Sequence, residues 1–317
     1  MWTRYWSHGA MHSCNTSYDQ NYRGAIESFW RTGFERLAPG SRVLDIGTGN
    51  GPLPRLLLSL ESRPDLSCEA IDLAEIAPPW LLQVPVSARD RVRFHGACAA
   101  ECTPFEDASF DLVVSQWGLE YSELKVSVPE VLRVLAPGGA VALLLHHVEA
   151  LPVALAAHEI GHLLWLMEGA SFLDAADDML APMALAGTAQ GLEQLANNQG
   201  AHRARDQFNA LQDALQSRIV QGRCTDVLAE VRQAVGTLLG LAARQGEGPA
   251  RVALQDLTVG LQDALLRLQE LRKHALDEPS VRVLATDLAA GAPYQLDVVR
   301  DQGAVMAWSL TVTPGRG

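Results

Sequence analysis

The sequence predicts an α/β protein whose mostly parallel sheet is interrupted by a long helical insertion. Three observations lead to this fold class. Short apolar runs alternate with amphipathic stretches from Ser41 to about His147, helical periodicity fills about 125 residues after Ala150, and β-rich runs return near the C-terminal end. Apolar strands separated by helices indicate βαβ units and a parallel sheet that is buried on both faces.

Short apolar runs in the first half are the predicted strands of this sheet. They cover 42–46, 68–73, 92–95, 110–115 and 140–146. Helical patterns fill most of the gaps, notably at 54–60 and 129–135. In RVLAPGGAVALLLHH a helix is expected to end at Leu135, a turn to follow at 137–139, and an apolar strand to come next.

Residues 149–278 are predicted to form the helical insertion. Three apolar stripes at helical spacing run through it: Phe208, Leu211, Leu215 and Ile219; Leu228, Val231, Val235 and Leu238; and Leu254, Leu257, Leu261, Ala264, Leu268 and Leu271. The last stripe has coiled-coil spacing. These helices are expected to pack on one another or on a partner chain, so the insertion walls a substrate cavity, pairs two subunits in a homodimer, or does both.

The C-terminal part is expected to return to the sheet. The runs 281–288, 294–301 and 304–312 are rich in β-forming residues, and 301–303 suits a tight turn between the last two. The α/β core is therefore predicted to consist of residues 41–148 and 279–317.

Composition limits the function classes. The 317 residues are 48% hydrophobic, no apolar run approaches the roughly 20 residues of a membrane span, and the N-terminal stretch lacks the layout of a signal peptide. We therefore expect a cytoplasmic protein with no membrane partner. A net charge of -12 argues against nucleic acid as a partner. Five scattered cysteines without a CxxC pair suggest reduced thiols.

The stretch VLDIGTGNG, residues 43–51, carries the strongest functional signal. A strand is expected to end at Ile46, and Gly47, Gly49 and Gly51 allow positive φ angles and a close backbone approach at the turn into a helix. Asp72 ends the second predicted strand, where a carboxylate can accept both hydroxyls of a ribose. A nucleotide-like ligand is implied, although close packing of a helix on a strand also requires small residues.

Several motifs in order resemble the class I S-adenosylmethionine-dependent methyltransferases, particularly the small-molecule branch. They are the acidic glycine loop, the acidic end of the second strand, AAECTPFEDASFDLVVS and VLRVLAPGGAVALL. The resemblance covers roughly residues 18–148 and the terminal strands. It implies a Rossmann-like, seven-stranded methyltransferase sheet that is mostly parallel with an antiparallel last strand, S-adenosylmethionine as the cofactor, and an N-terminal helical lid at residues 1–40.

The resemblance also implies roles for particular residues. The predicted cofactor-binding set is Tyr18, Asp45, Gly47, Gly49, Gly51, Asp72, Ala100, Glu101 and Ser115. Gln116 and Trp117 follow at the end of the fourth strand and face the methyl group and the substrate. The sequence departs from the family at Ala99, because relatives often have an aspartate there that meets the adenine amine.

Histidines are the candidate residues for proton transfer, metal binding or contact with the acceptor. Methyl transfer needs mainly alignment of the acceptor and exclusion of water, with a base only if the acceptor must lose a proton. His146 and His147 end the fifth strand and are the candidate bases, or else cap the strand through hydrogen bonds. His158 and His162 belong to HEIGH, which fits a zinc-binding pattern, a lining of the acceptor pocket, or ordinary helix packing.

The sequence therefore predicts an S-adenosylmethionine-dependent methyltransferase that acts on a small molecule, with oxygen slightly preferred over nitrogen or carbon as the acceptor atom. No metal site is predicted for this enzyme. Two alternatives stay open. The first is a non-catalytic protein of the same fold that serves binding or dimerisation, which Ala99 motivates, and the second is a zinc-dependent hydrolase that uses HEIGH at 158–162.

Overall fold

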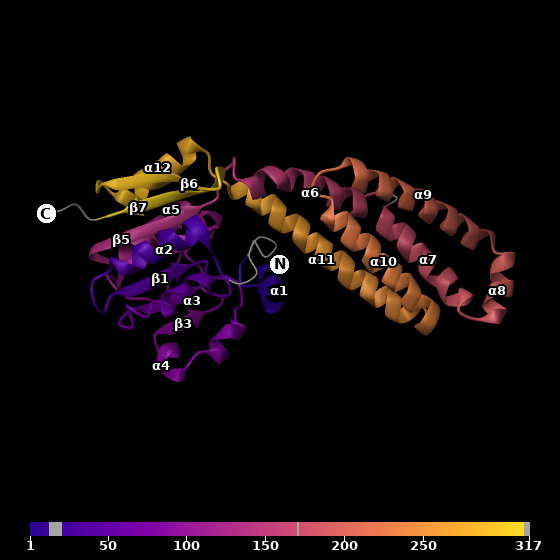
Figure 1. The fold of residues 1–317 in the computed structure, drawn as a ribbon, viewed down its shortest axis with the longest axis horizontal. Helices are drawn as coiled ribbons and strands as arrows, with labels where there is room; N and C mark the ends of the chain where they lie inside the picture. Colours follow the sequence, from indigo (N-terminus) through magenta and orange to yellow (C-terminus); the bar gives the residue numbers. More distant parts are fainter. Residues whose placement is uncertain (13–20, 170, 314–317) are drawn as a thin grey trace. The chain divides into compact units, whose positions relative to one another are not determined.

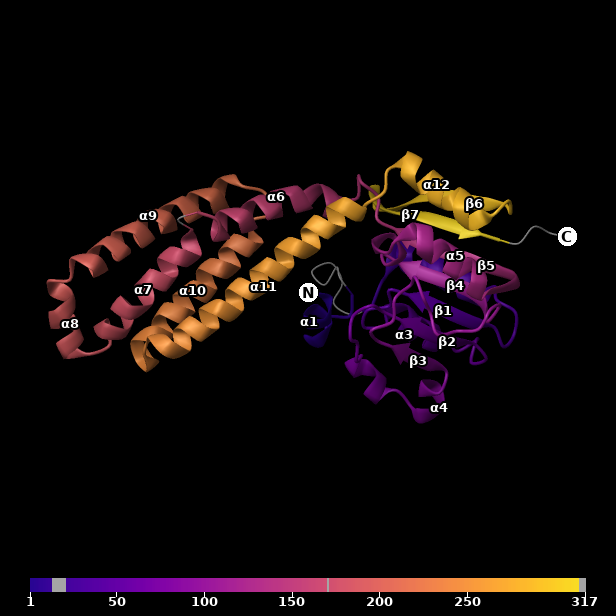
Figure 2. The ribbon, with the colours of Figure 1, turned by 180° about the vertical axis from the view of Figure 1, so that it is seen from behind.

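The chain folds into two compact units. The computed structural model describes residues 1–12, 21–169 and 171–313. One unit, the α/β unit, comprises Met1–Val153 and Lys273–Gly317, and the other, the helical unit, comprises Ala154–Arg272. Figure 1 labels most of the helices and strands of both units, and Figure 2 also labels β2 and β4. None of the helices among the described residues has the length and apolar character that crossing a bilayer requires.

The α/β unit is built on a sheet of seven strands among the described residues, in the order β3-β2-β1-β4-β5-β7-β6. The strands are β1 (Arg42–Ile46), β2 (Ser67–Ile71), β3 (Val92–His95), β4 (Phe110–Gln116), β5 (Leu135–Leu145), β6 (Tyr294–Asp301) and β7 (Ala304–Val312). Strands β1 to β5 pair in parallel, and β7 is antiparallel to both β5 and β6. This confirms the predicted fold class, a mostly parallel sheet with an antiparallel last strand.

Helices cover both faces of the sheet and make it a three-layer structure. Helices α5 (Leu124–Val134) and α12 (Glu278–Ala289) pack on one face. Helices α2 (Gly24–Glu35) and α3 (Pro52–Leu58) pack on the other. Neighbouring residues of β1 divide between the two cores, Val43 on one side and Leu44 on the other, as the alternation of a strand requires.

Two predicted elements differ from the structure. Residues 281–288, predicted as a strand, belong to helix α12. The buried residues of this segment are Val281, Leu284, Ala285 and Leu288, which is helical spacing, so packing on the sheet overrides the β propensity of the valines. Strand β5 begins at Leu135 and not at residue 140, because Leu135 pairs with Phe110 of β4, so the turn predicted at 137–139 lies within this strand.

The N-terminal part and the connections contain shorter helices. They are α1 (Trp2–Ser7), η1 (Pro79–Gln83), α4 (Val86–Arg89) and η2 (Leu119–Tyr121). Strands β6 and β7 are joined at Gln302 and Gly303, whose φ angles are 48° and 85°. Positive φ at two successive residues is typical of the tight hairpin turn that the sequence predicts there.

The helical insertion consists of α6 (Leu151–Met167), α7 (Phe172–Ala186), α8 (Ala189–Ala196), α9 (Gln199–Gln221), α10 (Asp226–Gln245) and α11 (Glu247–His274), which Figure 2 shows from behind. The three apolar stripes lie on α9, α10 and α11, one stripe to each helix. Most of their residues join a single core together with Leu163, Phe172 and Leu180. The stripes therefore serve packing within this unit.

The chain leaves and re-enters the α/β unit at one place. Leu276 donates its N–H to the carbonyl of His146 at 2.8 Å, and Val148 donates to the carbonyl of Leu276 at 3.2 Å. The two ends of the insertion are thus hydrogen-bonded beside the end of β5. This junction brings residues that follow the insertion next to the carboxyl edge of the sheet.

Candidate functional site

The glycine loop lies where β1 leads into α3. Gly47, Gly49 and Gly51 have φ angles of 70°, 54° and 74°, a region that residues with a Cβ rarely adopt. A Cβ atom on Gly47 would lie 2.8 Å from the Cα of Gly118, and one on Gly51 would lie 2.6 Å from the ring of Phe94. These two glycines are therefore needed for close packing within the protein, the alternative that the sequence left open.

Gly49 faces the N-terminal helix. A Cβ on this residue would lie 2.7 Å from the ring of Trp6 in α1. The side chain of Asn50 donates to the carbonyls of Trp6 at 2.9 Å and Ala10 at 2.7 Å, which holds the segment in place. Helix α1 thus covers the middle of the loop. Tyr18, predicted to bind the cofactor, lies outside the described residues.

Asp72 follows β2 and is hydrogen-bonded to the glycine loop. One carboxylate oxygen accepts from the N–H of Gly49 at 2.7 Å, and the other accepts from the N–H of Ala74 at 2.8 Å. The side chain is buried, and this burial raises the pKa of Asp72 above its usual value. Its hydrogen bonds fix the carboxylate beside the loop, and each oxygen still has a lone pair for a ligand.

Asp45 lies near the end of β1 and is also buried. Burial raises the pKa of Asp45 to about 8, and the nearby charge of Asp72 adds to the effect. One of its carboxylate oxygens has no hydrogen-bond partner within the described residues. A buried acid in this situation is a natural partner for a positively charged ligand group, since such a group would favour its ionised form.

Asp45 is one of several residues at this edge with unpartnered buried polar atoms. Within the described parts of the chain, Oδ1 of Asn50, Nε2 of Gln116 and Nε1 of Trp117 also have no hydrogen-bond partner. They come from the loop after β1 and from the end of β4, which is the neighbouring strand. Buried polar groups are normally paired, so this group of donors and acceptors is suited to a polar ligand.

The end of β4 positions three of the predicted residues. Ser115 is fully buried, donates to the carbonyl of Ile46 at 2.7 Å and accepts from the N–H of Leu119 at 2.9 Å. Its hydroxyl therefore ties β4 to β1. Gln116 accepts a hydrogen bond from the indole N–H of Trp30. Trp117 has a φ angle of 55°, an uncommon backbone conformation for a bulky residue.

His146 is paired with a buried glutamate that sequence analysis did not identify. One carboxylate oxygen of Glu120 lies 2.8 Å from Nδ1 of His146 and 2.9 Å from its backbone nitrogen. The imidazole stacks on Trp117, with the ring centroids 5.4 Å apart, and meets Tyr121 edge-on. Glu120 lies in η2, just beyond β4, where the sequence offers no periodic signal.

His147 is arranged differently. Its Nδ1 accepts a hydrogen bond from the backbone N–H of Glu149 at 2.9 Å, and its ring stacks on Trp308 of β7 at 4.2 Å. Burial lowers the pKa of His147. This histidine therefore caps the end of β5, the second role that the sequence allowed for it.

Ala100 and Glu101 lie in the loop after β3. Ala100 packs against the core formed with α5 and α12. A carboxylate oxygen of Glu101 accepts from the N–H of Glu123 at 2.8 Å. The loop is therefore tied to the start of α5, and its predicted contact with adenine stays a prediction.

The HEIGH residues lie in the helical unit. Nδ1 of His162 accepts a hydrogen bond from Nε of Arg218 at 2.9 Å. Nε2 of His162 donates to the carbonyl of Arg223 at 2.8 Å. Both ring nitrogens have protein partners, one of them a cation, which does not suit a metal ligand. His158 is exposed. Across the described ranges, no group of three or more metal-binding side chains occurs. The predicted role of His158 and His162 in substrate binding stays a prediction.

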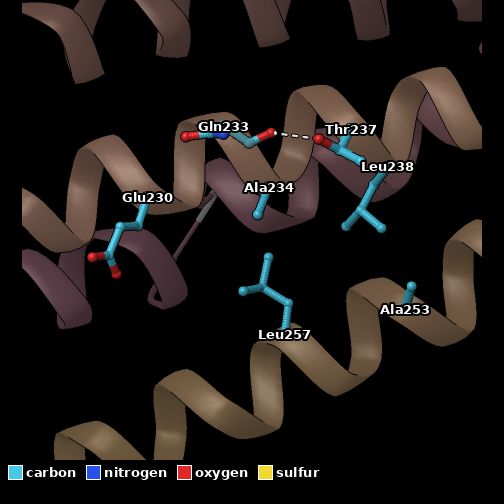
Figure 3. A pocket seen from close by; sticks show the side chains of 7 residues that line it. All are labelled: Glu230, Gln233, Ala234, Thr237, Leu238, Ala253 and Leu257. Atoms are coloured by element: carbon cyan, nitrogen blue, oxygen red, sulfur yellow. Dashed lines mark hydrogen bonds between the residues drawn. The ribbon is translucent and has the colours of Figure 1, made fainter.

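The helical unit also contains a groove of about 400 Å³ between α10 and α11, shown in Figure 3. Its lining includes Glu230, Thr237 and Leu257. The hydroxyl of Thr237 donates to the carbonyl of Gln233 within the same helix at 3.1 Å. None of the residues predicted to bind cofactor or substrate lines this groove.

Comparison with known proteins finds a family match within the α/β unit. Residues 44–143 match the family model described as a methyltransferase domain. The match begins within β1 and ends within β5, so it contains the glycine loop, Asp72 and the end of β4.

Curated relatives are similar over part of the chain. The ubiquinone/menaquinone biosynthesis C-methyltransferase UbiE of Cupriavidus metallidurans is 31% identical over 43% of this chain and 58% of its own. The demethylmenaquinone methyltransferase of Clavibacter sepedonicus is 34% identical over 36% of this chain and 46% of its own. The chain thus spans about half the length of these relatives. A geranyl diphosphate C-methyltransferase from Streptomyces coelicolor aligns with a TM-score of 0.33, at 19% identity, over 38% of this chain and 43% of its own.

Proposed function

We propose that this protein, whose α/β core resembles the class I S-adenosylmethionine-dependent methyltransferases, transfers a methyl group from S-adenosylmethionine to a small molecule. The observation that carries the proposal is the group of unpartnered buried atoms beside the glycine loop. Asp45 offers an acceptor, and Gln116 and Trp117 offer donors. This combination fits a ligand with both an ammonium and a carboxylate group, as the methionine part of the cofactor has.

Each of these residues is expected to bind a different part of the cofactor, according to its place at the sheet edge. Asp45 and the glycine loop would hold the methionine part, Asp72 would accept the ribose hydroxyls, and Ala100 and Glu101 would flank the adenine. Ser115 supports this arrangement indirectly, since its hydroxyl ties β4 to β1. When bound, the cofactor supplies a methyl group activated by a sulfonium.

We propose carbon as the acceptor atom. The two histidines at the end of β5 give oxygen a slight preference in the sequence, but the Cupriavidus metallidurans relative is named as a C-methyltransferase. The rings of Trp117, Tyr121 and His146 lie together beyond β4 and β5. An aromatic surface of this kind suits a flat, conjugated acceptor that stacks on it.

Of the two histidines, His146 is the better proton acceptor. Nδ1 of His147 already accepts a backbone N–H, so in the neutral ring the proton is on Nε2 and no ring nitrogen is left to act as a base. In His146, Nδ1 faces a carboxylate, and Nε2 is the nitrogen that can take a proton.

A cytoplasmic location and pairing of two chains through the insertion stay predictions.

Labelled methyl transfer tests the proposal. Protein incubated with S-adenosylmethionine carrying a tritiated methyl group and a panel of phenols, enols, amines and thiols should yield a labelled product. Asp72→Ala should reduce the yield, whereas Asp111→Ala should not, because Asp111 accepts a backbone N–H at the opposite end of β4. Cofactor binding without transfer to any acceptor would favour the non-catalytic binding protein.

A further inference from the structure

We infer that Glu120 is a positioning residue, which holds the His146 ring with its proton on Nδ1 so that Nε2 accepts a proton from the methyl acceptor. The inference deepens the proposed function and rests on it. Neither the motifs of the sequence nor the family comparison assigns a role to Glu120.

The contacts of Glu120 define how it acts. The side chain of Glu120 is fully buried. One of its carboxylate oxygens is hydrogen-bonded to both the ring nitrogen Nδ1 and the backbone nitrogen of His146, at 2.8 and 2.9 Å. Since an oxygen of a carboxylate has no hydrogen to donate, it accepts from both the backbone N–H and the ring Nδ1–H of His146. The neutral ring is therefore held as the Nδ1–H form.

The neighbours of His146 fix the plane of its ring. Trp117 stacks on one side with an interplanar angle of 24°, and Tyr121 meets the ring at 80°. The backbone on which Glu120 is mounted is itself fixed, because Nδ1 of His274 donates to the Glu120 carbonyl at 2.8 Å. The orientation of Nε2 thus follows from contacts on several sides of the Glu120–His146 pair.

These contacts indicate the kind of acceptor. In the proton transfer, the O–H bond of the acceptor breaks, the proton moves to Nε2 of His146, and the electron pair stays on the acceptor oxygen. The carboxylate of Glu120 stabilises the imidazolium that forms. An acceptor of this type has an ionisable hydroxyl conjugated to the carbon that receives the methyl group.

The tautomers of neighbouring histidines provide a direct test. Long-range ¹H–¹⁵N spectra of the full-length, ¹⁵N-labelled protein distinguish protonation at Nδ1 from protonation at Nε2, and His146→Gln and His147→Gln assign the signals. We expect Nδ1–H for His146 and Nε2–H for His147, which serves as an internal reference because Nδ1 of His147 accepts from Glu149. Protonation of neutral His146 at Nε2 in the wild-type protein would overturn the inference, and this requires no variant of Glu120.

Two variants at Glu120 separate its acceptor oxygen from the rest of the side chain. Glu120→Leu keeps similar bulk but removes the oxygen, so the Nδ1–H population of His146 should fall while that of His147 stays the same. Glu120→Gln should retain the Nδ1–H form, because the backbone N–H of His146 keeps the amide oxygen in place. An unchanged His146 tautomer in a folded Glu120→Leu protein would contradict the assignment.

The same samples distinguish failure of this inference from failure of the proposed function. Each is titrated with S-adenosylhomocysteine in a calorimeter before the spectra are recorded. If the wild-type protein fails to bind this ligand, the methyltransferase proposal and the acceptor role built on it both fail, even if the tautomers are as expected. If it binds and the tautomers differ from those expected, the role of Glu120 alone is wrong.

Discussion

At the scale of single residues, Asp72 has a structural role and a proposed binding role. Replacement by alanine removes the acceptor for the N–H groups of Gly49 and Ala74 and the proposed partner of the ribose hydroxyls. Affinity for S-adenosylhomocysteine should fall by about 1–3 kcal/mol, the cost of leaving buried groups unpaired. Titration calorimetry measures this change. Unaltered affinity would show that the ribose is bound elsewhere.

The ionisation of Asp45 gives the protein a characteristic pH dependence. Its pKa is about 8 in the folded protein, against about 3.9 in an unfolded chain. Between these values the folded state keeps a proton that the unfolded state has lost. The free energy of unfolding should therefore decrease as pH rises toward 8, by up to about 1.4 kcal/mol per pH unit, and then level off.

Urea denaturation between pH 7 and 9 tests this prediction. In this window the buried histidines with lowered pKa values, His12 and His147, are neutral. Asp45→Asn has no carboxyl group to ionise, so its stability should depend much less on pH. An equal slope in the variant and the wild-type protein would mean that Asp45 is ionised throughout.

The site residues also show what a sequence can predict about a site. Asp45, Asp72 and the three glycines belong to a motif with fixed spacing, and the structure places them around one loop. Glu120 has no such signal, because its importance comes from burial against His146, a residue 26 positions away. Its contact depends on the pairing of β4 with β5, which local sequence patterns do not reveal.

At the scale of elements, α1 covers the glycine loop through the contact of Trp6 with Gly49. A ligand that approaches the loop amides must first displace this ring. Trp6→Ala should therefore increase the affinity for S-adenosylhomocysteine by about three- to tenfold, chiefly through faster association, because the open state becomes more populated.

Stopped-flow fluorescence and calorimetry measure these two quantities. Ser7→Ala, a change at an exposed residue of the same helix whose hydroxyl bonds the carbonyl of Arg4, is the control. Weaker binding by Trp6→Ala would instead mean that the helix closes over the bound ligand and contributes to its affinity.

Helix α12 shows where element prediction from sequence is limited. The run VRVLATDL, residues 281–288, has the β-branched content of a strand. The start of helix α12 is nevertheless marked by Asp277, an N-cap residue whose side chain accepts from the N–H of Ser280. Apart from the start of β5, the strands of the parallel core were predictable within a few residues, because apolar runs buried on both faces leave little ambiguity. The choice between helix and strand for a short apolar run depends on tertiary packing.

At the scale of the whole molecule, the two units have separate hydrophobic cores. Units of this kind commonly unfold in separate steps. We expect calorimetric heating to give two transitions, only one of which shifts upward with S-adenosylhomocysteine. At a ligand concentration 100 times the Kd the stabilisation should be about 2.7 kcal/mol. A shift of both transitions by the same amount would indicate that the units unfold together.

The central claim is that the cofactor of the class I methyltransferases binds at the glycine loop of the α/β unit. Titration of the wild-type protein with S-adenosylhomocysteine in a calorimeter tests it most directly, with Asp72→Ala as the comparison. We expect micromolar binding at one site per chain, and clearly weaker binding by the variant. No binding by the folded wild-type protein would contradict the claim, and the loop would then serve only the close packing of Gly118, Trp6 and Phe94 against its three glycines.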